Sequence, residues 1–94
     1  MQQSYQTVDI ERRGYGRRYT WLPVDVLNHE EFSIDFTGAY LRPEMIDIRP
    51  GDIVRWREGG RTIQAQVAEV HREPYLLHVR LENTAPLPPD AFYP

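Results

Sequence analysis

Glycines and prolines divide the chain into short segments in which apolar and polar residues alternate, and this pattern most constrains the fold. No amphipathic helix of three turns can be traced in the sequence. Alternation with a period of two instead predicts β-strands with one buried and one exposed face. The 94 residues suffice for one domain. We therefore expect an all-β protein, a small barrel or sandwich of five to six strands with extended N- and C-terminal arms.

The most regular local patterns are a strand and a hairpin. Residues 32–36 alternate three large apolar residues with two small polar ones, which predicts a strand. Residues 58–61 contain two glycines suited to the positive φ angles of a tight hairpin. On the return strand the alternation changes phase at Ala68, which predicts a β-bulge there. Pro43 can begin a single helical turn over 43–46.

The remaining strands are predicted from shorter patterns. Segments 6–10 and 19–22 alternate, and we expect Pro23 to interrupt the second of these ladders before it resumes at 24–26. The segment 75–81 alternates and predicts the last strand. We expect residues 1–83 to form one domain. Residues 84–94 contain four prolines, which predicts an extended arm.

Composition removes several classes of function. The absence of cysteine excludes disulfides, cysteine-ligated zinc, iron–sulfur clusters and thiol catalysis. No apolar run approaches the roughly 18 residues of a membrane span, and the N-terminus lacks the pattern of a secretion signal. The chain also lacks a Gly-x-Ser-x-Gly elbow and a phosphate-binding loop ending in lysine. We expect no enzymatic activity, no cofactor and no membrane partner, and a location in the cytoplasm or, for a viral protein, in the virion.

The charged residues are segregated along the chain. All 11 basic residues are arginines, against 14 acids, and the formal net charge is −3. Four of the arginines lie between residues 12 and 18, and four acids follow between residues 25 and 35. Such polarity favours head-to-tail association of like subunits over binding to a uniform polyanion.

A resemblance to known barrels covers the second half. The segment 48–56, with Gly51 and Asp52 before a strand, is followed by the glycine turn at 59–60 and by two apolar strands over 67–70 and 77–81. This layout resembles small SH3-like barrels, including KOW and Tudor-type modules. The resemblance implies a closed β-barrel whose Gly-Asp turn introduces a strand.

A second resemblance covers more of the chain. A first strand over 8–13, a Gly/Arg loop, the strand containing Trp21, a long loop and the hairpin after Gly51 together resemble tailed-phage head–tail joining or stopper proteins. The segment through 32–36 is shorter than that family usually carries. The resemblance implies a ring-forming subunit of the virion neck that acts through surfaces and arms.

The segment 12–21 is the main candidate site, and it has three interpretations. Arginines interleaved with aromatic residues are typical of single-stranded nucleic-acid binders. The segment could equally be a flexible hairpin loop whose Tyr19 and Trp21 belong to the core. It could also be an ordered arm that contacts the acids of a neighbouring subunit, which fits the segregated charge best.

Two further candidates are the tail and the histidines. Leu87, Phe92 and Tyr93 could dock in a groove on another subunit or fold back onto their own barrel. The three histidines lack metal-ligand spacing, so we expect surface histidines and no metal. The residues expected to bind a partner are Arg12, Arg13, Tyr15, Arg17, Arg18, Leu87, Phe92 and Tyr93.

These observations predict a non-enzymatic structural or assembly module. It would act through protein–protein contacts as a homo-oligomer or as part of a larger assembly, such as the head–tail connector of a phage virion. The alternative is an SH3-like barrel that binds nucleic acid through the Arg/aromatic loop, with salt-dependent affinity.

Overall fold

The computed structural model describes residues 6–38 and 40–87, and this part of the chain is all-β. It contains seven strands rather than the five to six expected, with a single turn of 3-10 helix between the fourth and fifth. The elements are β1 (Gln6–Arg12), β2 (Gly16–Val24), β3 (Val26–Leu27), β4 (Glu31–Asp35), η1 (Pro43–Met45), β5 (Ile53–Glu58), β6 (Arg61–Arg72) and β7 (Leu76–Pro86).

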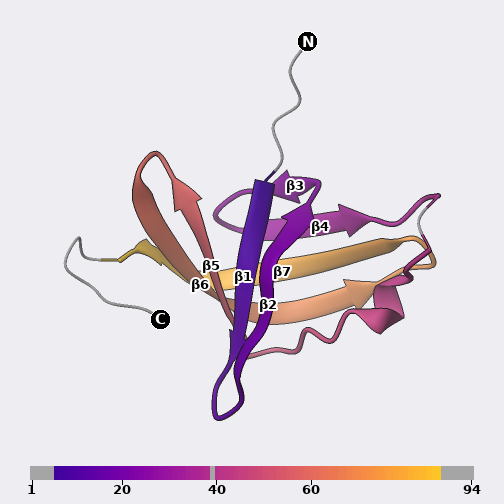
Figure 1. Ribbon diagram of the computed structural model, residues 1–94, viewed down its shortest axis with the longest axis horizontal. Helices are drawn as coiled ribbons and strands as arrows, with labels where there is room; N and C mark the ends of the chain where they lie inside the picture. The colour runs from indigo at the N-terminus through magenta and orange to yellow at the C-terminus, as the bar shows by residue number, and fades with distance from the viewer. Residues whose placement is uncertain (1–5, 39, 88–94) are drawn as a thin grey trace.

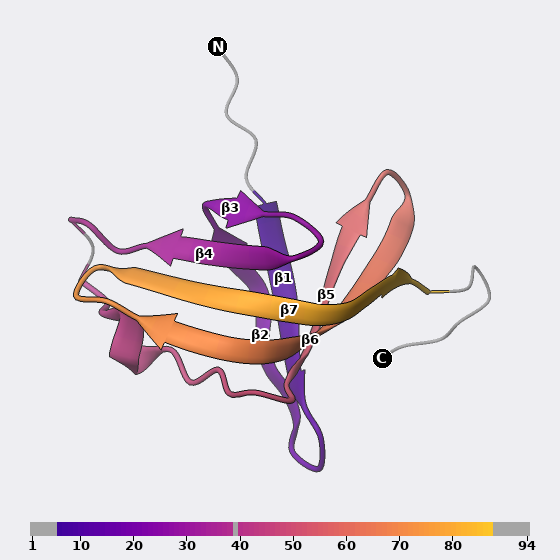
Figure 2. The ribbon, with the colours of Figure 1, turned by 180° about the vertical axis from the view of Figure 1, so that it is seen from behind.

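The strands form one antiparallel sheet in the order β2-β1-β5-β6-β7-β4-β3. Figures 1 and 2 show that the sheet curls, so that β1 and β2 cross the direction of β4, β6 and β7. The result is a half-barrel. The two edge strands are consecutive in the chain and are joined at Asp25, whose N–H donates to the Ser33 carbonyl at 2.9 Å. The chain therefore passes directly from one edge of the sheet to the other at Asp25.

The expectation that Pro23 interrupts its strand is wrong. Pro23 does not interrupt the ladder, because it pairs with Thr7 inside β2. The residue is tolerated there because β2 is an edge strand, where a missing N–H disrupts no ladder on the outer side. The strand breaks two residues later, at Asp25, and this break raises the strand count.

The core lies inside the curl of the sheet and draws on most of its strands. Phe32, Ile34 and Phe36 are buried, which confirms the strand predicted over 32–36. The single helical turn is also confirmed, with Pro43 at its first position and buried. The core consists of Val8, Ile10, Val24, Phe32, Ile34, Phe36, Ile46, Ile48, Val54, Trp56, Ile63, Ala65, Val67, Leu77, Val79 and Leu81.

Strands β5, β6 and β7 form a regular meander. The predicted hairpin at 58–61 is confirmed, with φ of 57° at Gly59 and 86° at Gly60. The predicted bulge is confirmed as well, because the pairing of β6 with β7 shifts by one residue between Val67 and Glu69. A second shift lies opposite the segment of β7 that contains Asn83, whose φ is 55°. The two shifts are in opposite directions and cancel.

The C-terminal part of β7 extends into the segment expected as an arm. Ala85 and Pro86 pair with β6, and the Leu87 N–H donates to the Thr62 carbonyl at 2.8 Å. The predicted partner-binding residues Phe92 and Tyr93 lie outside the described residues. Within the described part, the fold has no helix of the length and apolarity that a membrane crossing requires.

Candidate functional site

The β1–β2 hairpin ends in a tight turn that carries an exposed tyrosine. The Tyr15 N–H donates to the Arg12 carbonyl at 3.0 Å, and Gly14 between them has a φ of 81°. A glycine is favoured in this conformation because it has no Cβ to clash with the backbone. Figure 1 shows this turn projecting beyond the other strands. The Tyr15 side chain is 78% exposed there.

Strand β2 is irregular, and its irregularity determines where two side chains point. Its pairing with β1 shifts by one residue between Ile10 and Glu11 and again between Val8 and Ile10. The first shift inserts Arg18, and the second sets Thr20 and Trp21 opposite a single residue of β1. Bulges of this kind redirect side chains away from the regular alternation.

Trp21 lies at the second bulge in an unusual conformation. Its φ is 56°, and its side chain is 75% exposed. The interpretation that placed Trp21 in the core is therefore wrong, because the bulge reverses the direction of its side chain. A bulky residue in the left-handed region is a steric outlier, and such residues are found where the surrounding structure holds them. Here the Asp9 carboxylate holds the bulge by accepting the Trp21 N–H at 2.9 Å.

The Trp21 side chain lines an open groove of about 470 Å³. The groove is bounded by β1, β2, β3 and β5, and its lining includes Thr7, Asp9, Leu27, Trp56, Arg57 and Glu58. We call it the Trp21 groove. The His29 ring lies beside it, 6.3 Å from the Trp56 ring between centroids, and its Nε2 is 3.1 Å from the Glu58 carboxylate. The surface of the Trp21 groove is thus made of apolar and charged side chains together.

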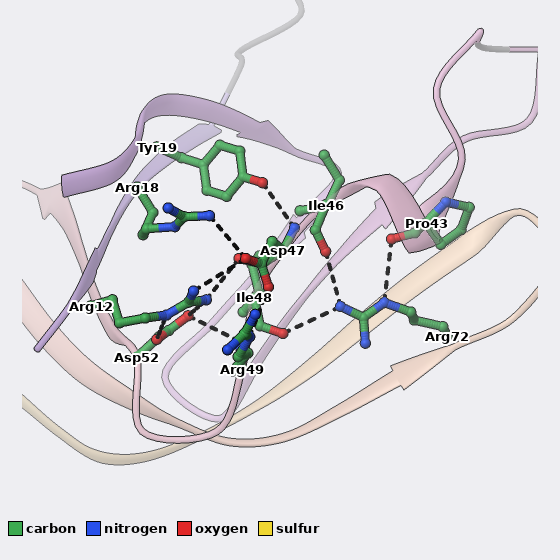
Figure 3. A network of polar contacts seen from close by, with 10 residues as sticks. All are labelled: Arg12, Arg18, Tyr19, Pro43, Ile46, Asp47, Ile48, Arg49, Asp52 and Arg72. Atoms are coloured by element: carbon green, nitrogen blue, oxygen red, sulfur yellow. Dashed lines mark hydrogen bonds and ion pairs between the residues drawn. The ribbon is translucent and has the colours of Figure 1, made fainter. Parts of the chain in front are cut away.

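Arg12, at the end of β1, is held inside the chain by two aspartates (Figure 3). Its Nε and Nη2 donate to the two carboxylate oxygens of Asp52 at 2.9 and 3.0 Å, and its Nη1 donates to Asp47 at 3.1 Å. The Asp52 residue is only 2% exposed. The hydrogen bonds that Arg12 donates to Asp52, and then those to Asp47, raise the pKa of its guanidinium. Arg12 therefore joins the first hairpin to the segment before β5.

Asp47 is the centre of a wider set of contacts. Arg18 Nη2 and Arg49 Nε donate to its carboxylate at 2.9 and 3.0 Å, and its N–H donates to the Tyr19 hydroxyl at 2.8 Å. The hydrogen bond from Arg12, with a further one from Arg49, lowers the pKa of Asp47 from 3.8 to about 2. The same segment is anchored from β6, where Arg72 donates to the Ile46 carbonyl at 2.9 Å (Figure 3).

The expected partner-binding residues are thus divided by the fold. Arg12 and Arg18 bind Asp47 within the chain, although Arg18 is also exposed, and the exposed residues Arg13, Tyr15 and Arg17 lie at the hairpin turn. Leu87 is half-buried beside β6, away from that turn. The three turn residues Arg13, Tyr15 and Arg17 form one exposed surface, which we call the hairpin tip.

Sequence reasoning missed two exposed surfaces. The first is the Trp21 groove, for which the only local signal was an aromatic residue, between Thr20 and Leu22, two positions before a proline. The second surrounds η1, where Tyr40 is 102% exposed and Leu41 and Met45 are exposed too. There the Arg42 guanidinium lies 5.3 Å from the centre of the Tyr75 ring. The alternation over 75–81 had placed Tyr75 on the same strand face as core residues.

The histidines lie on the outside of the sheet. His71 and His78 face each other across β6 and β7, a proximity that their sequence spacing does not indicate. Each is paired with a glutamate, His71 with Glu73 and His78 with Glu31. Over residues 6–38 and 40–87, no group of three or more histidine, aspartate or glutamate side chains is arranged to hold a metal ion.

Comparison with known proteins identifies no relative. The chain matches no family model, no curated protein and no solved structure. The function proposed below therefore rests on the geometry and charge of the chain itself.

Proposed function

We propose that this chain is a non-enzymatic assembly module, an SH3-like barrel that acts through protein–protein contacts in a larger complex such as the head–tail connector of a tailed-phage virion. The observation that carries the proposal is that one hairpin exposes two large aromatic side chains, Tyr15 at 78% and Trp21 at 75%. Large aromatic side chains are enriched at the centres of protein interfaces, because they offer much contact area for little loss of conformational entropy.

The distribution of charge supports protein partners. Residues 12–18 hold four of the 11 arginines and no acid, which leaves seven arginines against 14 acids in the rest of the chain. The hairpin is therefore a basic extension of an acidic body. Such a molecule is attracted to acidic protein surfaces, including those of its own copies.

The nucleic-acid alternative has less support from the geometry. It needs the four arginines of 12–18 to be presented together with Tyr15, Tyr19 and Trp21. Instead, Arg12 and Arg18 bind Asp47, and the Tyr19 hydroxyl accepts the Asp47 N–H. The exposed arginines at the turn itself are Arg13 and Arg17, so the alternative predicts a salt dependence of about two phosphate contacts. If the chain shows no salt-dependent binding to oligonucleotides, the nucleic-acid alternative is excluded.

The test is the size of the protein in an extract of its native source. We expect the wild-type chain to elute in a complex much larger than 11.1 kDa, and a variant with Arg13→Ala, Tyr15→Ala and Arg17→Ala to elute at a lower mass. Tyr40→Ala is the matched control, because Tyr40 is an even more exposed tyrosine that lies outside the hairpin. Elution of the wild-type chain as a monomer, both from the extract and after purification, would contradict the proposal.

A further inference from the structure

We infer that the partner of the Trp21 groove is a second copy of this chain, whose hairpin tip inserts Tyr15 against the Trp21 indole. The inference rests on the proposed assembly function and adds the identity of the partner and the two surfaces that meet. It begins from the strained backbone at Trp21, which holds an apolar ring in solvent beside a groove. Strain of this kind persists where the surrounding structure enforces it, and it is concentrated at binding sites.

The two surfaces are complementary in shape and chemistry. The hairpin tip presents one aromatic ring on a narrow two-stranded extension, and the groove presents an indole on an open concave surface. Aromatic rings associate favourably in offset-stacked or edge-to-face arrangements. A phenol ring against Trp21 and Leu27 would cover apolar side chains that line the groove.

Charge favours the same pairing. Arg13 and Arg17 flank Tyr15 at the tip, so a docked tip brings positive charge to the border of the groove. The groove lining itself is mixed, with Asp9 and Glu58 as well as Arg55 and Arg57, and Arg55 is paired with Glu11. The charges that line the groove balance, so the attraction comes from the acidic body as a whole, in which seven arginines stand against 14 acids outside residues 12–18.

A hairpin tip cannot reach the groove of its own chain. Trp21 lies five positions after Gly16, which corresponds to roughly 16 Å along the strand at about 3.3 Å per residue. Figures 1 and 2 show that the turn and β3 lie at opposite ends of β1. A hairpin tip that occupies the groove must therefore come from another molecule.

The same arrangement predicts head-to-tail association. One copy carries its tip at one end of the hairpin and its groove at the other, so each copy can donate a tip in one direction and accept one from the other. A reciprocal two-fold pair would require two hairpins to lie side by side along β2. There the bulge at Thr20 and Trp21 and the missing N–H of Pro23 interrupt the strand edge. Copies are therefore expected to add in series.

The experiment is analytical ultracentrifugation of the purified full chain and two complementary variants. We expect the wild-type chain to form species beyond a dimer as its concentration rises. Tyr15→Ala removes the tip residue and Trp21→Gly removes the groove residue, and each should weaken self-association by more than about tenfold. Tyr40→Ala and Asn83→Gly are the controls, the first for an exposed tyrosine and the second for a left-handed position at a bulge.

An equimolar mixture of the two variants decides the geometry. The intact groove of Tyr15→Ala accepts the intact tip of Trp21→Gly, so the mixture should form a one-to-one dimer that grows no further. Variants that assemble like the wild-type chain, a mixture that stays monomeric, or a wild-type chain that stops at a dimer would each overturn the inference. A purified wild-type chain that is monomeric at every concentration would overturn it too, whereas a large complex in the native extract would still support the proposed function.

Discussion

The β5–β6–β7 meander and the β1–β2 hairpin are both antiparallel, yet they use their side chains differently. In the meander, alternate residues of each strand enter the core, as Val54 and Trp56 do in β5. In β2 only Val24 is buried, and two bulges turn side chains outward or toward Asp47. The comparison indicates that the meander and β1 supply the core, whereas β2 and the turn before it present a surface.

The largest expected effect separates the two regions by stability. Leu77→Ala should lower the free energy of unfolding by about 4 kcal/mol, because this fully buried side chain leaves a cavity in the core. Tyr15→Ala should change it by less than about 0.5 kcal/mol, because the side chain is exposed. Urea denaturation followed by circular dichroism measures both. Similar losses for the two variants would show that the hairpin tip is part of the core.

The second effect tests the link between the regions. Asp52→Ala should lower the free energy of unfolding by about 3 kcal/mol, because the buried Arg12 fork and the Arg49 N–H lose their acceptor. Asp47→Ala serves as the comparison and should destabilise less, since the Asp47 side chain is 37% exposed. Thermal unfolding of both variants provides the measurement. A loss for Asp47→Ala equal to or greater than that for Asp52→Ala would contradict the central place given to Asp52.

The two regions also differed in how far the sequence predicted them. The meander was predicted with its hairpin and its bulge, because both leave a local mark in the sequence. The hairpin is marked by the glycines at 59 and 60, and the bulge by the phase change at Ala68. The position of Trp21 was not predicted, because an aromatic residue in an alternating segment is normally a core residue. Its exposure depends on the pairing of β2 with β1, and no local pattern marks that register.

The same limit applies to the candidate site. The sequence identified the Arg/aromatic segment but could not separate its arginines by role. Arg12 and Arg18 meet Asp47 across at least 29 residues of chain, a contact that only the folded sheet creates. Asp52 was predicted as a turn residue, and its second role as the acceptor of the Arg12 fork comes from its burial.

The third effect concerns backbone strain in the hairpin. Trp21→Gly should be more stable than Trp21→Ala by about 1 kcal/mol, because glycine adopts the left-handed conformation without the clash of a Cβ. The same pair of substitutions at Asn83 in the meander provides the control at a second left-handed position. Thermal unfolding compares the variants. If glycine and alanine at position 21 are equally stable, the backbone there is not strained.

The smallest effect is on acid stability. The pKa of Asp47 is lowered from 3.8 to about 2 in the folded chain, so its ion pairs stabilise the fold fully above about pH 4. That contribution is lost as the pH falls toward 2, because the carboxyl of the unfolded chain takes up a proton at a higher pH than that of the folded chain, which favours unfolding. Asp47→Asn should therefore show a smaller loss of stability between pH 4 and pH 2 than the wild-type chain. Parallel curves over this interval would assign the acid sensitivity to other groups.

The most direct measurement of the central claim is the fluorescence of Trp21 in a Trp56→Phe variant, in which it is the only tryptophan. If the Trp21 groove receives the hairpin tip of another copy, the emission shifts to shorter wavelength as the concentration of the chain rises, in step with the sedimentation coefficient. With Tyr15→Ala added, the shift should disappear. An emission maximum that stays constant while the chain assembles would show that Trp21 remains in solvent and would contradict the account.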